Sequence, residues 1–178
     1  MVIHMGADHQ GFELKKYLKG ILVETGYTVN DLGAATYDES DDYPDVARAV
    51  AERVSVDFER SRGILICNSG IGVCVVANKY PNVRAALVFS PDQAFDSRND
   101  DDVNVLCLSA GYTEPEVARQ TLLTWLKTPF SGEERFRRRL QKISDVETDI
   151  AEALRDEMAE RKAALRNDPP PELKHLSW

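Results

Sequence analysis

The chain has 178 residues, of which 43% are hydrophobic, and a formal net charge of -8 at pH 7. A chain of this length can bury one good core, which favours a single globular domain, and its acidic balance leaves no basic field for a nucleic-acid backbone. No apolar run approaches the roughly 18 residues of a membrane span, so the sequence predicts neither nucleic acid nor membrane as a partner.

The chain begins with Met1–Gly6, which lacks the basic and apolar regions of a signal peptide. Its cysteines and histidines show neither a CxxC motif nor the spacing of a zinc-ligand set; they are Cys67, Cys74, Cys107, His4, His9 and His175. These features predict a reduced, cytoplasmic protein without a structural metal.

Strand-like and helix-like segments alternate from the start. The strand Val2–Met5 precedes a helix with apolar residues on one side, and the strand Tyr27–Asn30 ends in the turn Asp31–Gly33. Further along we expect, in chain order, a helix at Pro44–Phe58, a strand at Gly63–Ile66, a helix through Lys79, a strand at Ala85–Phe89, a helix from about Asp92, a strand at Val103–Leu108 and a helix at Pro115–Lys127. The alternation predicts a three-layer α/β fold, in which a Rossmann-like, doubly wound, five-stranded parallel sheet lies between helices.

The region after Ser131 differs in composition. Within Ser144–Leu165, apolar residues recur at helical spacing between charged ones, at Val146, Ile150, Leu154, Met158 and Leu165. We expect one domain at residues 1–143, followed at 144–178 by an amphipathic helix and, from Asn167, an irregular tail with three consecutive prolines. The apolar stripe must cover either its own sheet domain or a second subunit, and we favour a subunit contact.

The segment Gly63–Lys79 combines a thiol with a glycine-containing loop. Its apolar run Gly63–Ile66 has the length of a buried parallel strand, Cys67 stands at the end of that strand, and a predicted helix follows. A thiol beside a helix N-terminus has its pKa lowered from about 8.5 toward neutrality, so Cys67 could act as a nucleophile or as a base. The alternative is an inert core thiol, the interpretation that we give to Cys74 and Cys107.

The loop that follows this thiol has little side-chain bulk. Its backbone N–H groups can form an anion-binding nest, suited to an oxyanion that develops during a reaction; they belong to Asn68, Ser69, Gly70, Ile71 and Gly72. Because glycines also connect elements in ordinary loops, the prediction depends on the place of this loop between a strand and a helix.

Ligands of doubly wound sheets bind beyond the carboxyl ends of the strands. We expect Asp8, His9, Cys67, Ser69 and the acidic run Asp100–Asp102 to meet at that edge. Taken alone, the first two would be a helix cap and a surface histidine. Their place after the first strand favours contact with a substrate instead.

Arg135 and Arg139 are four positions apart and therefore share one face of a helix. Two guanidinium groups on one face could bind a phosphate. The alternative is a solvated basic face that also includes Arg137 and Arg138. The spacing alone leaves both interpretations open.

Together these residues resemble the sugar-phosphate isomerase family that contains ribose-5-phosphate isomerase type B and the subunits of galactose-6-phosphate isomerase. The similarity runs from Met1 to about Ile143. It rests on ordered segments at Gly6–Phe12, Asp31–Gly33, Asp42–Asp45, Gly63–Lys79, Arg84–Leu87, Ser97–Arg98, Asn104–Leu108, and Arg135 with Arg138 and Arg139. Residues 1–143 are accordingly expected to form a sugar-phosphate isomerase domain.

The resemblance implies an aldose–ketose isomerase, an intramolecular oxidoreductase that works through a cis-enediolate without metal or organic cofactor. It also implies a homodimer with active sites between subunits, which could pair into tetramers. Cys67 matches the catalytic base and Asp8 and Tyr43 match residues near the sugar, whereas His9, Arg135 and Arg139 match phosphate contacts. In the oxyanion loop of the family, Ser69 stands in place of threonine and Asn68 in place of glycine.

Three positions depart from the family pattern. Asp100 stands where members acting on furanose sugars have the ring-opening histidine, Asp101 replaces the adjacent asparagine, and Gly111 replaces a phosphate-binding arginine. Asp100 could keep the ring-opening role, because neighbouring carboxylates raise one another's pKa values. We therefore count Asp100 with Cys67, Ser69 and Asp8 as catalytic candidates, and Asp101 as a substrate-binding one.

Three other interpretations remain open. The substrate could be a linear four-carbon sugar phosphate, of the erythrose 4-phosphate type, which needs no ring opening. The protein could also bind a sugar phosphate without catalysis, its acidic run being a solvated loop. A third possibility makes Cys67 a nucleophile, as in cysteine phosphatases, although no arginine follows the glycines here.

Overall fold

The structure, a computed structural model, describes residues 1–167, with side chains as far as residue 163. The predicted irregular tail, from residue 168 onward, lies outside the described residues. The elements, in chain order, are β1 Val2–Ala7, the short 3-10 helix η1 His9–Gly11, α1 Phe12–Glu24, β2 Thr28–Asp31, α2 Tyr43–Val56, β3 Ser61–Cys67, α3 Ile71–Ala77, β4 Ala85–Leu87, α4 Pro91–Asn99, β5 Val105–Ser109, α5 Pro115–Lys127 and α6 Glu134–Asn167.

All strands join one parallel sheet of five, in the order β2-β1-β3-β5-β4. The chain leaves β1 toward β2 on one side and continues through β3 on the other, so the strand order reverses between β1 and β3. In sheets of this kind, the crevice at such a reversal is the usual ligand site. The predicted fold class is confirmed, and the sheet directs attention to the carboxyl ends of β1 and β3.

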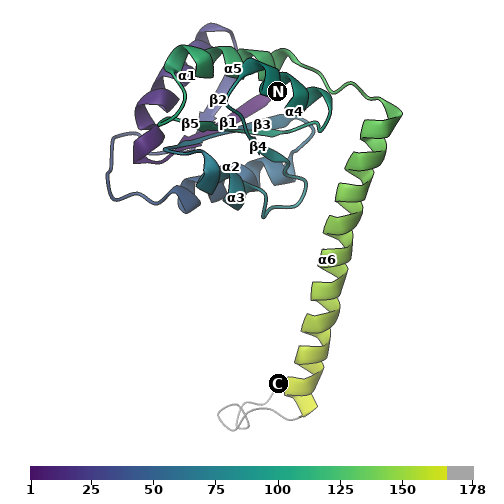
Figure 1. Cartoon of the computed structure of the whole chain (residues 1–178). Helices are drawn as coiled ribbons and strands as arrows, with labels where there is room; N and C mark the ends of the chain where they lie inside the picture. The colour runs from purple at the N-terminus through teal and green to yellow at the C-terminus, as the bar shows by residue number, and fades with distance from the viewer. Residues whose placement is uncertain (168–178) are drawn as a thin grey trace. The chain divides into compact units, whose positions relative to one another are not determined.

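Helices cover both faces of the sheet (Figure 1). One apolar cluster joins α1, α4 and α5 to strand residues that include Ile64 and Ile66, and the other joins α2 and α3 to residues that include Leu65 and Cys67. Successive strand residues point to opposite faces, and both faces are buried, which explains the unbroken apolar run in β3. Cys67 therefore belongs to the face that carries α2 and α3.

Element boundaries differ from the sequence-based expectation by a few residues, for local reasons. Helix α4 begins at Pro91 because the Oγ of Ser90 accepts a hydrogen bond from the N–H of Gln93 at 3.3 Å, an N-cap that fixes the first turn. Helix α3 ends at Ala77. The side chain of the next residue, Asn78, donates a hydrogen bond to the carbonyl of Ala85, the first residue of β4, at 2.9 Å. Both caps are side-chain effects that hydrophobic periodicity does not register.

The charged C-terminal region forms one helix, α6, which starts before Ser144 and includes Asn167. The chain divides into two compact units, of which the first is Met1–Phe136 and the second begins at Arg137. Large apolar side chains of α6 are exposed at Ile143, Val146, Ile150, Leu154 and Met158. No helix within residues 1–167 combines the length and the apolar character needed to cross a membrane.

Candidate functional site

Cys67 is the last residue of β3, and its thiol lies at the reversal point of the sheet. The side chain is 4% exposed, and the N–H of Gly70 donates to its Sγ at 3.1 Å. Gly70 adopts a left-handed conformation with φ of 75°, and a Cβ there would collide with the side chain of Leu87. Only glycine makes this turn without strain, so the sequence positions a hydrogen-bond donor against the sulfur.

The loop from Asn68 to Gly72 is anchored through its carbonyl side. The carbonyl of Asn68 accepts hydrogen bonds from the Oγ of Ser109 at 2.7 Å and from the N–H of Gly111 at 2.8 Å. The N–H of Ile71 donates to the Oγ of Ser69 at 3.3 Å. Within residues 1–167, the backbone N–H groups of Ser69 and Gly72 have no hydrogen-bond acceptor. These two donors remain available to an anionic ligand.

Asp8 follows β1 directly beside this loop. Ala7 is in register with Ile66 on the neighbouring strand, so Asp8 and Cys67 occupy equivalent positions on strands spaced about 4.8 Å apart. Asp8 is 6% exposed, and its carboxylate accepts a hydrogen bond from the N–H of Gly11 at 3.0 Å. Burial raises the pKa of Asp8, against the lowering effect of that hydrogen bond. The structure therefore brings two candidate catalytic side chains to the ends of adjacent strands at one edge of the sheet.

His9 is held by a residue that the sequence did not single out. Its backbone N–H donates to Oδ1 of Asp41 at 2.8 Å, and its Nδ1 lies 2.8 Å from the same oxygen. The hydrogen bond to Asp41 raises the pKa of His9, which favours the cationic imidazolium. The ring also makes an edge contact with Tyr37, at 6.3 Å between centroids. Both partners lie in the connection between β2 and α2. The acidic composition of this connection is the sequence feature that could have indicated a partner for His9.

Tyr43 begins α2 and lies against the start of α3. A Cβ on Gly72 would come within 2.7 Å of the ring of Tyr43, so the glycine permits this close approach. The tyrosine is 41% exposed. It joins Asp8, His9 and the Cys67 loop at the carboxyl edge of the sheet, as expected from the sequence.

The expectation that the acidic run lies at the same edge was wrong. Asp100 caps the C-terminus of α4, and Asp100–Asp102 precede β5, whose first residue Val105 pairs with Gly63. Gly63 and Cys67 are separated by four residues of strand, or about 13 Å at about 3.3 Å per residue. Residues before a strand in a parallel sheet lie at its amino edge, so Asp100 and Asp101 are remote from Cys67 of the same chain.

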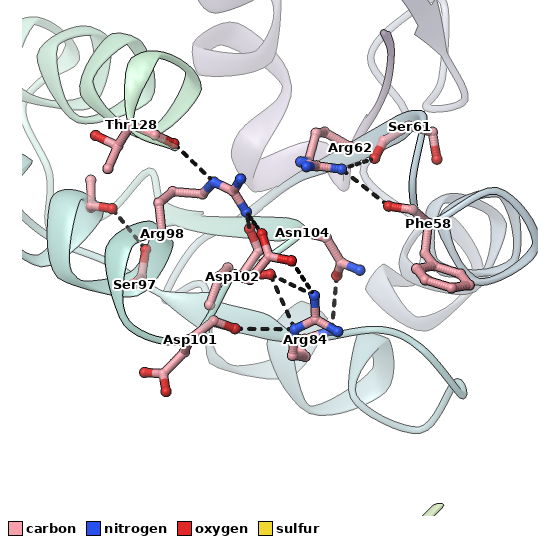
Figure 2. Close-up of polar contacts among 12 residues, drawn as sticks. Phe58, Ser61, Arg62, Arg84, Ser97, Arg98, Asp101, Asp102, Asn104 and Thr128 are labelled. Carbon is pink, nitrogen blue, oxygen red and sulfur yellow. Dashed lines mark hydrogen bonds and ion pairs between the residues drawn. The ribbon is translucent and has the colours of Figure 1, made fainter. Parts of the chain in front are cut away.

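The three aspartates of the acidic run also differ in their partners. Asp102 forms ion pairs with Arg84 at 2.8 Å and with Arg98 at 2.6 Å (Figure 2). Asp100 accepts a hydrogen bond from the side chain of Asn99 at 2.7 Å, and Asp101 is exposed. The repulsion expected among three adjacent aspartates is therefore relieved at Asp102.

Asn68, which stands in place of a glycine of the family loop, and Gly111 are in steric contact. A Cβ on Gly111 would collide with Oδ1 of Asn68. The side chain at position 68 therefore occupies the space that any side chain at position 111 would need. With asparagine at position 68, position 111 has no room for an arginine, so the two differences from the family pattern fit together.

The two predicted phosphate-binding arginines lie on the exposed surface of α6, whose geometry places Arg135 and Arg139 on one face. Nε of Arg135 pairs with Glu133 at 2.9 Å, and its guanidinium lies 4.4 Å from the ring centre of Phe136. Arg139 belongs to the second unit of the chain. Their role in phosphate binding stays a prediction.

The remaining cysteines pack on the face that carries α2 and α3. Cys107 is fully buried, whereas Cys74 is half-buried, and a hydrogen bond with Cys107 lowers the pKa of Cys74 to about 7. In the part of the chain that the structure describes, no three His, Cys, Asp or Glu side chains gather into a metal-binding group.

The model of the Ribose/Galactose Isomerase family matches residues 3–143 of the chain. The chain therefore belongs to this family, and the resemblance seen in its motifs is confirmed. The fold and its strand order agree with this assignment.

Individual relatives extend the comparison. A protein of Mycoplasma genitalium named probable ribose-5-phosphate isomerase B is 41% identical over 141 residues, which are 79% of this chain and 92% of the relative. The crystal structure of ribose-5-phosphate isomerase B from that organism, with bound ribulose-5-phosphate, has a TM-score of 0.80 at 40% identity and covers 83% of this chain and 96% of its own. A D-erythrulose-4-phosphate isomerase of Pectobacterium atrosepticum is 36% identical over 130 residues, 73% of this chain and 85% of the relative.

Proposed function

We propose that the protein is a cytoplasmic, cofactor-independent aldose–ketose isomerase that interconverts ribose 5-phosphate and ribulose 5-phosphate. The observation that carries this proposal is the arrangement at the carboxyl ends of β1 and β3, where a thiol, a buried carboxyl group and two unoccupied backbone donors occur together. Similarity to ribose-5-phosphate isomerases B over most of the chain supports the same reaction.

In the proposed reaction, the thiolate of Cys67 removes the proton from C2 of the open-chain aldose. The electron pair forms the C1–C2 double bond of an enediolate, and the proton then returns to C1 of the ketose while the hydroxyl proton moves from O2 to O1. Asp8 and Ser69 would transfer that hydroxyl proton. The free N–H groups of Ser69 and Gly72 stabilise the negative oxygen, which exists only along the reaction path.

The substrate would be held by neutral hydrogen-bonding groups and by cationic side chains. Tyr43, whose ring lies against Gly72, and the backbone donors of the loop Asn68–Gly72 would contact the sugar. His9, whose pKa is raised by the hydrogen bond to Asp41, would bind the phosphate as the imidazolium. Arg135 and Arg139, which share one helix face, would also donate hydrogen bonds to the phosphate.

A homodimer is part of the proposal because Asp100, which stands at the position of the family's ring-opening residue, lies at the opposite edge of the sheet from Cys67 of the same chain. Asp100 and Asp101 precede β5, whereas Cys67 ends β3, so they would serve the candidate site of a second copy. The exposed apolar residues of α6 would contribute to contacts between subunits. Such dimers could also pair into tetramers.

Asp100 is the proposed ring-opening group. Opening ribofuranose breaks the bond between C1 and the ring oxygen, removes the proton of the C1 hydroxyl and adds a proton to the ring oxygen. One carboxyl group can accept the first proton and supply the second, so the histidine of the family is not required chemically. Asp101 would hydrogen-bond the sugar beside it.

A second candidate substrate is a linear four-carbon sugar phosphate. The observations in its favour are the aspartates at positions 100 and 101 and the similarity to a D-erythrulose-4-phosphate isomerase. Its C4 oxygen carries the phosphate and cannot close a five-membered ring, so no ring opening would be needed. Faster turnover of erythrose 4-phosphate than of ribose 5-phosphate would favour this candidate.

The test is a panel of four-, five- and six-carbon sugar phosphates assayed with the wild-type protein and with Cys67→Ala. We expect the wild-type protein to interconvert ribose 5-phosphate and ribulose 5-phosphate, and Cys67→Ala to lose turnover while it retains affinity for the sugar phosphate. Binding without turnover in the wild-type protein would identify a binding protein. A covalent phosphocysteine would identify the thiol as a nucleophile.

A further inference from the structure

Two arginines converge on one carboxylate at the amino edge of the sheet (Figure 2). Arg84 precedes β4 and donates from Nη2 to Oδ2 of Asp102 at 2.8 Å, and Arg98 on α4 donates from Nη1 to Oδ1 at 2.6 Å. The side chain of Arg98 is 8% exposed and those of Arg84 and Asp102 are 22% and 28% exposed, so the three charges are largely shielded from solvent. We call these three residues the aspartate clamp.

The clamp also holds the backbone around Asp102. Arg84 donates from Nε to the carbonyl oxygens of Asp101 and Asp102, at 3.1 Å each, and Arg98 donates from Nη1 to the carbonyl of Val103 at 2.7 Å. Asp102 is in the left-handed region with φ of 44°, a conformation that is uncommon for a residue other than glycine. Such a conformation persists where the surroundings over-determine it, as the clamp does here.

The two aspartates that precede the clamp are left outside it. The carboxylate of Asp101 points away from Arg84 (Figure 2) and has no hydrogen-bond partner among residues 1–167. Within the same residues, Asp100 bonds only its neighbour Asn99 through its side chain, and its N–H continues α4 by donating to Asp96 at 2.9 Å. Hydrogen bonds thus hold the backbone on both sides of residues 100–101, whose carboxylates remain available to a ligand.

We infer that Arg84, Arg98 and Asp102 are positioning residues, which fix the conformation of residues 100–101 and so align the ring-opening carboxylate with the sugar. The inference rests on the proposed function. Misplacement of a reacting group by about 1 Å can cost about a hundredfold in rate, so loss of the clamp should impair ring opening. Proton transfer by Cys67 does not use the carboxylate of Asp100, so at saturating sugar the loss of the clamp should impair it much less.

Asp102→Asn is the variant of choice, because asparagine tolerates the left-handed conformation but removes the charge that both arginines bind. Arg62→Gln is the matched control: it removes a guanidinium at the same edge that donates to the carbonyls of Phe58 and Ser61 and not to the clamp. Arg84→Lys is a second variant, which retains the charge and loses the forked geometry.

Two reactions separate ring opening from proton transfer. Conversion of ribose 5-phosphate needs both, whereas deuterium uptake from D2O into C1 of ribulose 5-phosphate needs only the proton transfer, because that ketose cannot close a five-membered ring. We expect Asp102→Asn to lower conversion about tenfold or more and to leave deuterium uptake within about twofold, with Arg84→Lys changing in the same direction and Arg62→Gln unchanged.

Amide hydrogen exchange gives a readout that does not depend on activity. The N–H of Val103 donates to the carbonyl of Ser97 at 3.0 Å, and we expect residues 100–103 to exchange faster in Asp102→Asn while β1 and β3 keep their protection. Equal losses in both reactions, or unchanged exchange at residues 100–103, would overturn the inference. A wild-type protein that neither converts nor exchanges the sugars would instead refute the proposed function, and hydrogen exchange would still decide whether the clamp orders this segment.

Discussion

Gly70→Ala tests the geometry of the Cys67 loop most directly. The alanine would need a φ of 75° and its Cβ would meet the side chain of Leu87 and, at 3.1 Å, the carbonyl oxygen of Leu108. The left-handed conformation costs about 1–2 kcal/mol and overpacking in a well-packed site about 1–3 kcal/mol. We therefore expect the free energy of unfolding to fall by about 2–5 kcal/mol, which lowers Tm by about 4–20 °C in a chain of this size.

The same substitution should affect catalysis, because the N–H of Gly70 donates to Sγ of Cys67. A shift of the loop would displace the neighbouring donors as well, and loss of one oxyanion donor typically lowers kcat about 10²–10³-fold. Thermal unfolding and steady-state kinetics measure the two effects. Gly20→Ala, on α1 with no atom within 4 Å of its added Cβ, is the control and should be neutral or slightly stabilising. A Tm of Gly70→Ala equal to that of the wild-type protein would refute this reasoning.

Three further predictions concern His9, the thiol of Cys74 and the contact between Asn68 and Gly111. Asp41→Asn should lower the pKa of His9 toward its ordinary value of 6.5; because phosphate binding needs the imidazolium, KM should start to rise at a lower pH than in the wild-type protein, and identical pH profiles would contradict this. Cys74, half-buried with a pKa of about 7, should be the first thiol alkylated by iodoacetamide at neutral pH, which peptide mass spectrometry after short exposure can check. Gly111→Ala should lower activity about tenfold by displacing Asn68, and the added substitution Asn68→Gly should restore part of it; strictly additive effects in the double variant would argue against the steric coupling.

Much of the fold could be predicted because β3 and its neighbours follow simple rules. The run Gly63–Ile66 is apolar throughout since both faces of the sheet are covered, and the helices show apolar residues at helical spacing. The place of Cys67 at the end of its strand followed from the same pattern. These features depend on local sequence, which a single chain displays.

Other features depended on tertiary structure. The hydrogen bond between His9 and Asp41 joins residues that are 32 positions apart, and its formation depends on the path of a long connection. The left-handed turn at Gly70 and its contact with Leu87 likewise become visible only in three dimensions. The amino-edge position of Asp100 is different, because the order of this residue and its strand in the sequence already contained the information.

The separation of Cys67 and Asp100 across one sheet has a consequence for defective chains. In the proposed dimer, a chain that lacks the thiol still lends its acidic segment to its neighbour, and a chain that lacks the acidic segment still offers its thiol. Two chains with these different lesions would complement each other and share one intact centre, whereas two chains with the same lesion would have none. The activity of a mixed population of dimers would then depend on which two lesions are combined in a dimer, and not only on how many chains carry a lesion.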